Sequence, residues 1–195
     1  MKIYDNHTHL NDKPFAGKEA DYIQKARDLD VVGMNCVGQD PEMNLGALEL
    51  AKRFANVKAI IGYCPDVAKD YDQAAEDLLV EQVKGGQVVA IGEIGLDYYW
   101  PENPPRPLQQ QVLRSQLALA RELSLPVIIH DRDAHADTMD IVREFPRVRG
   151  VFHCFAGSVE MARELVDRGW YLSFNGAATF KNARKAPEVI REVAL

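Results

Sequence analysis

Short apolar segments recur seven times along the chain. Each is rich in Val, Ile and aromatic residues and is bounded by turn residues, which is typical of a buried β-strand. Most of the intervals are close to the roughly 30 residues that a strand, a crossover helix and the next parallel strand require. The pattern therefore predicts seven consecutive strand–helix units, whose strands begin near Lys2, Val31, Lys58, Val88, Pro126, Gly150 and Trp170.

Helical patterns fill most of the intervals between these segments. Asp40-Pro41 places a capping carboxylate before a proline at the first helical position. Ser158 similarly caps a helix that we expect to turn three residues inward: Met161, Leu165 and Val166. Alternating strands and helices of this kind indicate a parallel sheet that is covered by helices.

The longest interval contains four prolines between Trp100 and Pro107, so it predicts a long loop after the fourth strand. No change in composition divides the chain, which indicates a single domain. Seven strands are compatible with an open, doubly wound sheet or with most of an eight-stranded barrel. No Gly-x-Gly-x-x-Gly follows the first strand, which argues against a dinucleotide-binding fold.

Composition narrows the functional classes. The chain has 195 residues, of which 47% are hydrophobic and 27% charged, as in globular proteins. Its net charge of −6 argues against a broad basic face for nucleic acid, but not against an enzyme that meets phosphate through metal ions. Three widely spaced cysteines make a disulfide framework improbable, so we expect a cytoplasmic protein. No apolar run of about 18 residues occurs, which argues against a membrane span.

Four of the five histidines follow predicted strands. His7 and His9 end the first strand, and residues two apart on a strand point to the same side, so both imidazoles converge. Such a pair suits a divalent metal, although a pair of solvated histidines is the alternative. His130 and His153 end the fifth and sixth strands. Either one alone would be interpreted as a hydrogen-bonded structural histidine, but the four together favour a metal centre at one rim of the sheet.

Glu93 lies at the end of the apolar fourth strand, where an unpaired carboxylate is costly to bury. A carboxylate that bridges two metals explains its position, and a salt bridge to Arg132 is the alternative. Three nearby carboxylates are predicted to be structural: Asp97, Asp131 and Asp133. His135 is expected to be a solvated helix residue, and Cys36 and Cys154 small buried residues.

These residues, in this order, resemble the TatD family of metal-dependent nucleases within the amidohydrolase-like barrels. The similarity spans essentially the whole chain. The matching stretches are His7-Thr8-His9, Gly92 to Tyr98, Pro126 to Ala134, Gly150 to Gly157 and Trp170 to Gly176.

The resemblance implies a TIM-type (β/α)8 barrel and a two-metal site. His7 and His9 would bind one divalent ion, His130 and His153 the second, and Glu93 would bridge them as the catalytic carboxylate. Zn²⁺, Mg²⁺ and Mn²⁺ all suit such ligands. Family members hydrolyse DNA phosphodiesters, often from the 3′ end, and some are assigned removal of a D-amino acid from tRNA.

The chain departs from the family pattern in two places. A loop that usually reads Gly-x-His-Pro-His is here Gly62-Tyr63-Cys64-Pro65-Asp66. The family's eighth strand, with an Asp that completes the metal site, is not found, so residues 1–195 are expected to form one barrel domain with seven of eight strands, incomplete at its C-terminal end. Unpaired edges on the first and seventh strands make an oligomer conceivable.

The leading hypothesis is therefore hydrolysis of DNA by water activated between two metal ions, with Arg132 as a phosphate contact. A second hypothesis keeps the metals and changes the substrate to an ester, an amide, a lactone or D-aminoacyl-tRNA. A third is a catalytically silent relative that binds metal or a partner.

Overall fold

A computed structural model describes residues 2–193 of the chain. Its seven strands form one parallel sheet in sequence order. Each begins within one residue of its predicted position, so the prediction of seven strand–helix units is confirmed. The strands are β1 (Ile3–Thr8), β2 (Val31–Val37), β3 (Val57–Ile61), β4 (Val88–Asp97), β5 (Val127–Arg132), β6 (Gly150–Phe152) and β7 (Tyr171–Leu172).

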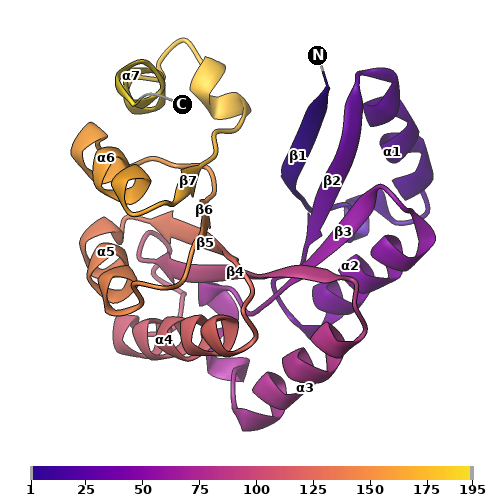
Figure 1. Ribbon diagram of the computed structural model, residues 1–195, viewed down its shortest axis with the longest axis horizontal. Helices are drawn as coiled ribbons and strands as arrows, with labels where there is room; N and C mark the ends of the chain where they lie inside the picture. Colours follow the sequence, from indigo (N-terminus) through magenta and orange to yellow (C-terminus); the bar gives the residue numbers. More distant parts are fainter. Residues whose placement is uncertain (1, 194–195) are drawn as a thin grey trace.

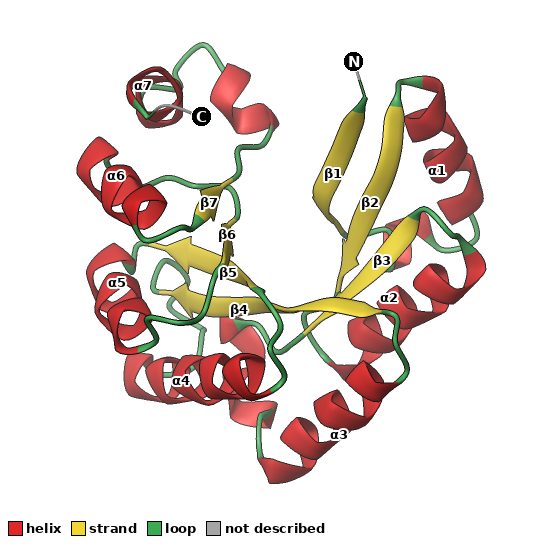
Figure 2. Cartoon of the chain, viewed as in Figure 1, coloured by secondary structure: helices red, strands yellow, loops and turns green. Residues whose placement is uncertain are grey.

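The sheet curves into an open half-barrel with the helices on its outer side (Figures 1 and 2). The strands β1 and β7 are its two edges and face each other across the opening. This arrangement confirms the barrel-type fold with seven strands. The helices are α1 (Glu19–Asp28), α2 (Pro41–Arg53), α3 (Gln73–Lys84), α4 (Arg106–Glu122), α5 (His135–Glu144), α6 (Val159–Asp167) and α7 (Lys185–Glu192), with short 3₁₀ segments η1 (Lys13–Phe15), η2 (Pro65–Asp70) and η3 (Gly176–Thr179).

Local capping fixes where the helices begin. The Asp40 carboxylate accepts a hydrogen bond from the Met43 amide at 2.8 Å at the start of α2, as the sequence predicts. Ser158 caps α6 in the same way through the Met161 amide. The expected inward orientation of Val166 is wrong, because this residue is 39% exposed.

Two large apolar clusters lie between the sheet and the helices. One packs β4–β7 against α4–α6 and includes Ile94 and Leu117, and the other packs β2–β4 against α1–α3 and includes Ile61 and Leu79. A small third cluster fills the inner side of the sheet. Each half of the barrel therefore has its own core, and the central strand β4 belongs to both.

Three buried side-chain amides hold the carboxyl ends of β3 and β4. Each one accepts from the backbone N–H and donates to the backbone C=O of a single residue, as a neighbouring strand would. They lie on α2 and α4, so the helices fix the loops that follow these strands. The pairs are Asn44 with Gly62, Gln116 with Tyr63 and Gln109 with Asp97.

Gly95 allows β4 and β5 to approach closely beside the site. Its φ is +152°, and a Cβ placed there would lie 1.8 Å from the carbonyl oxygen of His130. Only glycine fits this position without moving the strand that carries His130. Among residues 2–193, no helix is long and apolar enough to cross a membrane.

Candidate metal centre

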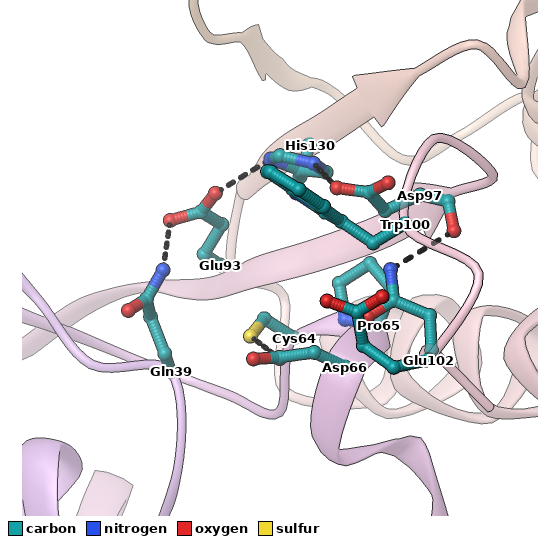
Figure 3. A pocket seen from close by; sticks show the side chains of 10 residues that line it. Gln39, Cys64, Pro65, Asp66, Glu93, Asp97, Trp100, Glu102 and His130 are labelled. Atoms are coloured by element: carbon teal, nitrogen blue, oxygen red, sulfur yellow. Dashed lines mark hydrogen bonds and ion pairs between the residues drawn. The ribbon is translucent and has the colours of Figure 1, made fainter.

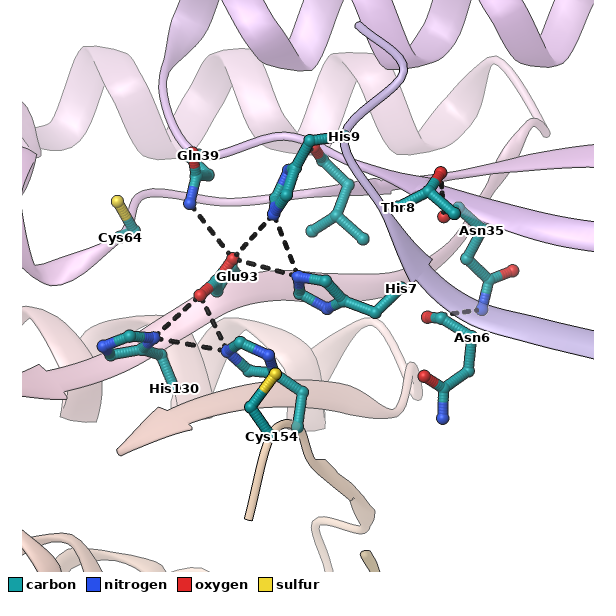
Figure 4. Close-up of polar contacts among 12 residues, drawn as sticks. Asn6, His7, Thr8, His9, Asn35, Gln39, Cys64, Glu93, His130 and Cys154 are labelled. Atoms are coloured by element: carbon teal, nitrogen blue, oxygen red, sulfur yellow. Dashed lines mark hydrogen bonds and ion pairs between the residues drawn. The ribbon is translucent and has the colours of Figure 1, made fainter. Parts of the chain in front are cut away.

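Glu93 lies at the centre of the site. It is 3% exposed and lies within β4, which continues to Asp97, so the prediction that Glu93 ends its strand is wrong. Four imidazoles surround its carboxylate (Figure 4). The nitrogens of His7 and His9 lie 3.3 and 3.5 Å from its Oε2, and those of His130 and His153 lie 2.8 and 2.7 Å from its Oε1.

The side chains form two groups of potential metal ligands that share Glu93. One group is His7, His9 and Glu93, and the other is Glu93, His130 and His153; the donor atoms within each lie within 4.8 Å of one another. Each group uses a different oxygen of the carboxylate. The alternative ion pair between Glu93 and Arg132 is not formed.

Hydrogen bonds on the far side of two rings leave the inward-facing nitrogens free. His9 Nδ1 lies 3.0 Å from the Val37 carbonyl oxygen, so it carries the proton and Nε2 keeps its lone pair. His130 Nε2 lies 3.1 Å from an oxygen of Asp97, which orients the ring so that Nδ1 faces Glu93. Such contacts hold metal-binding histidines in the required tautomer.

The charges in the cluster are strongly coupled. Burial alone raises the pKa of Glu93, but hydrogen bonds from the four histidines hold it well below the usual range, so the side chain is a carboxylate. Burial lowers the pKa of His130, yet Asp97 and Glu93 stabilise its imidazolium and raise the pKa to about 10. At His7, burial outweighs the stabilisation by Glu93, so the pKa of His7 is lowered.

The donor set fits divalent cations. The Nε2 atoms of His7 and His9 lie 3.0 Å apart beside the carboxylate, an arrangement in which two lone pairs converge on one point. A cation there satisfies both nitrogens and Glu93, and the same holds for His130 and His153 on the other oxygen. Imidazole and carboxylate are the ligands that Zn²⁺ and related divalent metals take in proteins. These two groups of side chains are therefore a candidate metal site.

Two neighbours of the site have roles that the sequence analysis missed. Gln39 Nε2 donates a hydrogen bond of 3.1 Å to Glu93 Oε2 and so orients the carboxylate. Its signal was a polar residue just beyond the second strand, at the same rim as the histidines. Asp97 was expected to be structural, and it orients His130.

The remaining candidates lie further out. His135 pairs with Asp131 at 2.8 Å on the outer side of the rim. Cys36 is fully buried as expected, but Cys154 is exposed, so the prediction of a buried thiol there is wrong. Arg132 is exposed and lies with its guanidinium 3.9 Å from the ring centre of Tyr99.

A cavity of about 420 Å³ adjoins Glu93 and His130 (Figure 3). Its other walls come from the loops after β2, β3 and β4. The loop after β3 is the one that departs from the resembled pattern, and it brings Cys64 and Asp66 to the cavity. The loop after β4 brings Trp100 and Glu102.

A half-barrel of parallel strands, with histidines and a shared carboxylate converging at one rim, defines a metal-dependent hydrolase of the amidohydrolase-like type. Residues 4–195 match the family model described as TatD related DNase, and the chain belongs to that family. It is 40% identical over 195 residues to the uncharacterized metal-dependent hydrolase YabD of Bacillus subtilis (strain 168), an alignment that covers 98% of this chain and 75% of that protein.

Two further comparisons agree with this assignment. The 3′-5′ ssDNA/RNA exonuclease TatD of Citrobacter koseri is 32% identical over 176 residues, which cover 89% of this chain and 67% of that protein. The crystal structure of YjjV, a TatD homologue from Escherichia coli K12, superposes with a TM-score of 0.90 at 31% identity. That alignment covers 98% of this chain and 75% of YjjV.

Proposed function

We propose that the protein hydrolyses phosphodiester bonds of DNA with two divalent metal ions. The observation that carries the proposal is the Glu93 carboxylate, which offers one oxygen to each of two histidine pairs. A carboxylate shared in this way suits two ions about 3.5–4 Å apart, as in many phosphodiesterases. The similarity to an exonuclease that acts on single-stranded DNA and RNA supports this choice of substrate.

The residues of the chain have separate roles in this proposal. His7 and His9 would hold one ion, His130 and His153 would hold the other, and Glu93 would offer one carboxylate oxygen to each. Bound ions supply a water of lowered pKa and neutralise charge on the phosphate. Gln39 orients Glu93, and Asp97 fixes the tautomer of His130.

Arg132 is proposed to contact a phosphate next to the bond that is cleaved. Its guanidinium lies 5.2 Å from the ring of Trp100, at the edge of the cavity, and stacks on Tyr99. An arginine held in this way keeps its hydrogen-bond donors free for a phosphate. Arg132 and the bound ions would then supply the positive charge that allows a protein of net charge −6 to bind a DNA phosphate.

The decisive experiment is digestion of an end-labelled single-stranded oligonucleotide with Mn²⁺ or Mg²⁺. We expect cleavage that EDTA abolishes and that Glu93→Ala reduces at least 100-fold, whereas Glu49→Ala, which removes an exposed carboxylate on α2, has no effect. Calorimetric titration with Mn²⁺ should show two ions in the wild type and fewer in Glu93→Ala. Cleavage that survives chelation would overturn the proposal.

The same preparation tests the rival activities. Turnover of D-aminoacyl-tRNA or of small esters that exceeds turnover of the oligonucleotide would assign the metal centre to carbonyl substrates. Uptake of Mn²⁺ without hydrolysis of any of these substrates would indicate a silent relative.

A further inference from the structure

We propose that the cavity beside Glu93 is a nucleobase subsite, in which Trp100 stacks on a base and the carboxylates of Asp66 and Glu102 select cytosine and adenine through the amino group at C4 or C6. The inference rests on the proposed function, because it places the phosphate at the metal centre. It adds a preference of the protein for particular nucleotides.

The lining of the cavity separates two chemical environments. At one end are Glu93 and His130, which belong to the metal centre. At the other end are Asp66 and Glu102, and among residues 2–193 no Lys or Arg lines the cavity (Figure 3). An anionic phosphate therefore suits only the end with the metal ions, and the occupant of the other end must be neutral or cationic and must donate hydrogen bonds. The volume of about 420 Å³ lies within the range of small-ligand sites.

Trp100 supplies an aromatic surface to this cavity. Trp100 is 47% exposed, which is unusual for a large aromatic side chain, and it is one of two tryptophans in the chain. Its indole lies edge-to-face with Tyr99, with ring centres 4.7 Å apart at 89°, and the Arg132 guanidinium lies 5.2 Å from the ring centre. Exposed aromatic rings beside a nucleic-acid site stack on bases of any sequence.

The loop that carries Trp100 is held in place from both ends. Asn103 donates a hydrogen bond to the Asp97 carbonyl oxygen at 3.2 Å, and Gln109 donates to the Pro104 carbonyl oxygen at 2.8 Å. Prolines within the loop restrict its backbone further. A base that stacks on Trp100 therefore meets a surface that needs little ordering, which preserves binding free energy.

The carboxylates provide hydrogen-bond acceptors beside the indole. Within residues 2–193, Glu102 forms no hydrogen bond or ion pair, and Asp66 accepts from the Cys64 thiol through only one of its oxygens. Cytosine and adenine present an amino group that donates to such acceptors, whereas thymine and uracil present a carbonyl oxygen at the corresponding position. Two acceptors facing each other repel, so the cavity should favour cytosine and adenine.

The sharpest test compares homopolymers of deoxycytidine and deoxyuridine of equal length, since the two bases have the same size and differ at the amino position. We expect kcat/KM with Mn²⁺ to be about tenfold higher for deoxycytidine, because one hydrogen bond to a charged acceptor is worth about that factor. Asp66→Asn combined with Glu102→Gln should reduce the ratio to below twofold. Asp70→Asn, an exposed charge change in the same 3₁₀ segment, should leave it unchanged.

Variants of the aromatic residue test the stacking separately. Trp100→Ala should raise KM for both homopolymers about tenfold with little change in kcat, and Trp100→Phe should restore most of the loss. Equal rates on the two homopolymers in the wild type, or a preference that survives loss of both carboxylates, would overturn the selection. An unchanged KM in Trp100→Ala would overturn the stacking.

A binding measurement keeps the inference independent of catalysis. Trp170 is buried, so quenching of tryptophan emission by dCMP should come from Trp100 and should be lost in Trp100→Phe. We expect dUMP to bind about tenfold more weakly than dCMP. If no oligonucleotide is cleaved, the proposed function fails, and equal quenching by dCMP and dUMP would overturn the subsite as well. If oligonucleotides are cleaved and quenching is equal, only the subsite fails.

Discussion

Gln116 on α4 fixes the loop after β3, and its replacement by methionine tests this role. The Tyr63 amide donates to its Oε1 at 2.9 Å, and the Tyr63 carbonyl oxygen accepts from its Nε2 at 2.8 Å. Gln116 is fully buried and Tyr63 is 3% exposed, so water does not reach either backbone group in the variant. Methionine has a similar length and helix propensity, so Gln116→Met removes the hydrogen bonds and leaves the packing almost unchanged.

The magnitude follows from two backbone groups left without partners. Each buried, unpaired group costs about 1–3 kcal/mol, so we expect a loss of about 3 kcal/mol in the free energy of unfolding. For a chain of this size that corresponds to a fall in Tm of about 6–12 °C. Urea and thermal unfolding followed by circular dichroism, both in EDTA, measure the two quantities without a contribution from bound metal.

Gln111→Met is the matched control, because Gln111 lies on the same helix and is exposed. We expect it to change stability by less than about 0.5 kcal/mol. The reasoning would be refuted if the two variants were equally stable. If Gln116→Met lowered the free energy of unfolding and also changed its slope against urea concentration, the variant would differ in the surface exposed on unfolding.

Three further predictions concern single positions. Gly95→Ala should lower soluble yield and the free energy of unfolding by more than about 3 kcal/mol, because its Cβ overlaps the His130 carbonyl; a stable variant with unchanged metal uptake would contradict this. The hydrogen bond to Asp131 raises the pKa of His135, so its NMR titration midpoint should lie above 6.5 and return towards that value in Asp131→Asn. Since the raised pKa stabilises the folded state at low pH, the stability difference from Asp131→Asn should be largest below pH 6.5 and vanish as pH rises through the folded-state pKa. Ellman's reagent should label Cys154 alone in the native protein, because the other two thiols are buried; rapid labelling of all three would show that the cores open readily.

The sequence was informative wherever one local pattern determines structure. Seven apolar runs located the strands, because a parallel strand covered on both faces has to be apolar along its length. The convergence of the histidines could be anticipated, since parallel strands end at one rim and residues two apart share a side. These local rules gave both the architecture and the side chains that surround Glu93.

Other features depend on distant parts of the chain and were missed. Gln116 has an ordinary local context, and only the packing of α4 brings it to Tyr63. Cys154 was expected to be buried because it follows an apolar strand, but the backbone turns there with φ of +48° and exposes the thiol. Val166 fits the inward period of its helix, yet the sheet beside it ends at β7.

Because each half of the barrel has its own core, a metal site between the halves would affect how firmly they are held together. His7 lies on β1 and His9 directly follows it in one half, whereas His130 and His153 come from the other half, and Glu93 lies on the strand that both halves share. Ions bound at this carboxylate tie residue 7 to residue 153 through a few coordination bonds, closing long segments of chain as a cross-link does. Because binding to the folded state alone stabilises it by mass action, ions bound there would also hold the two halves of the open barrel together.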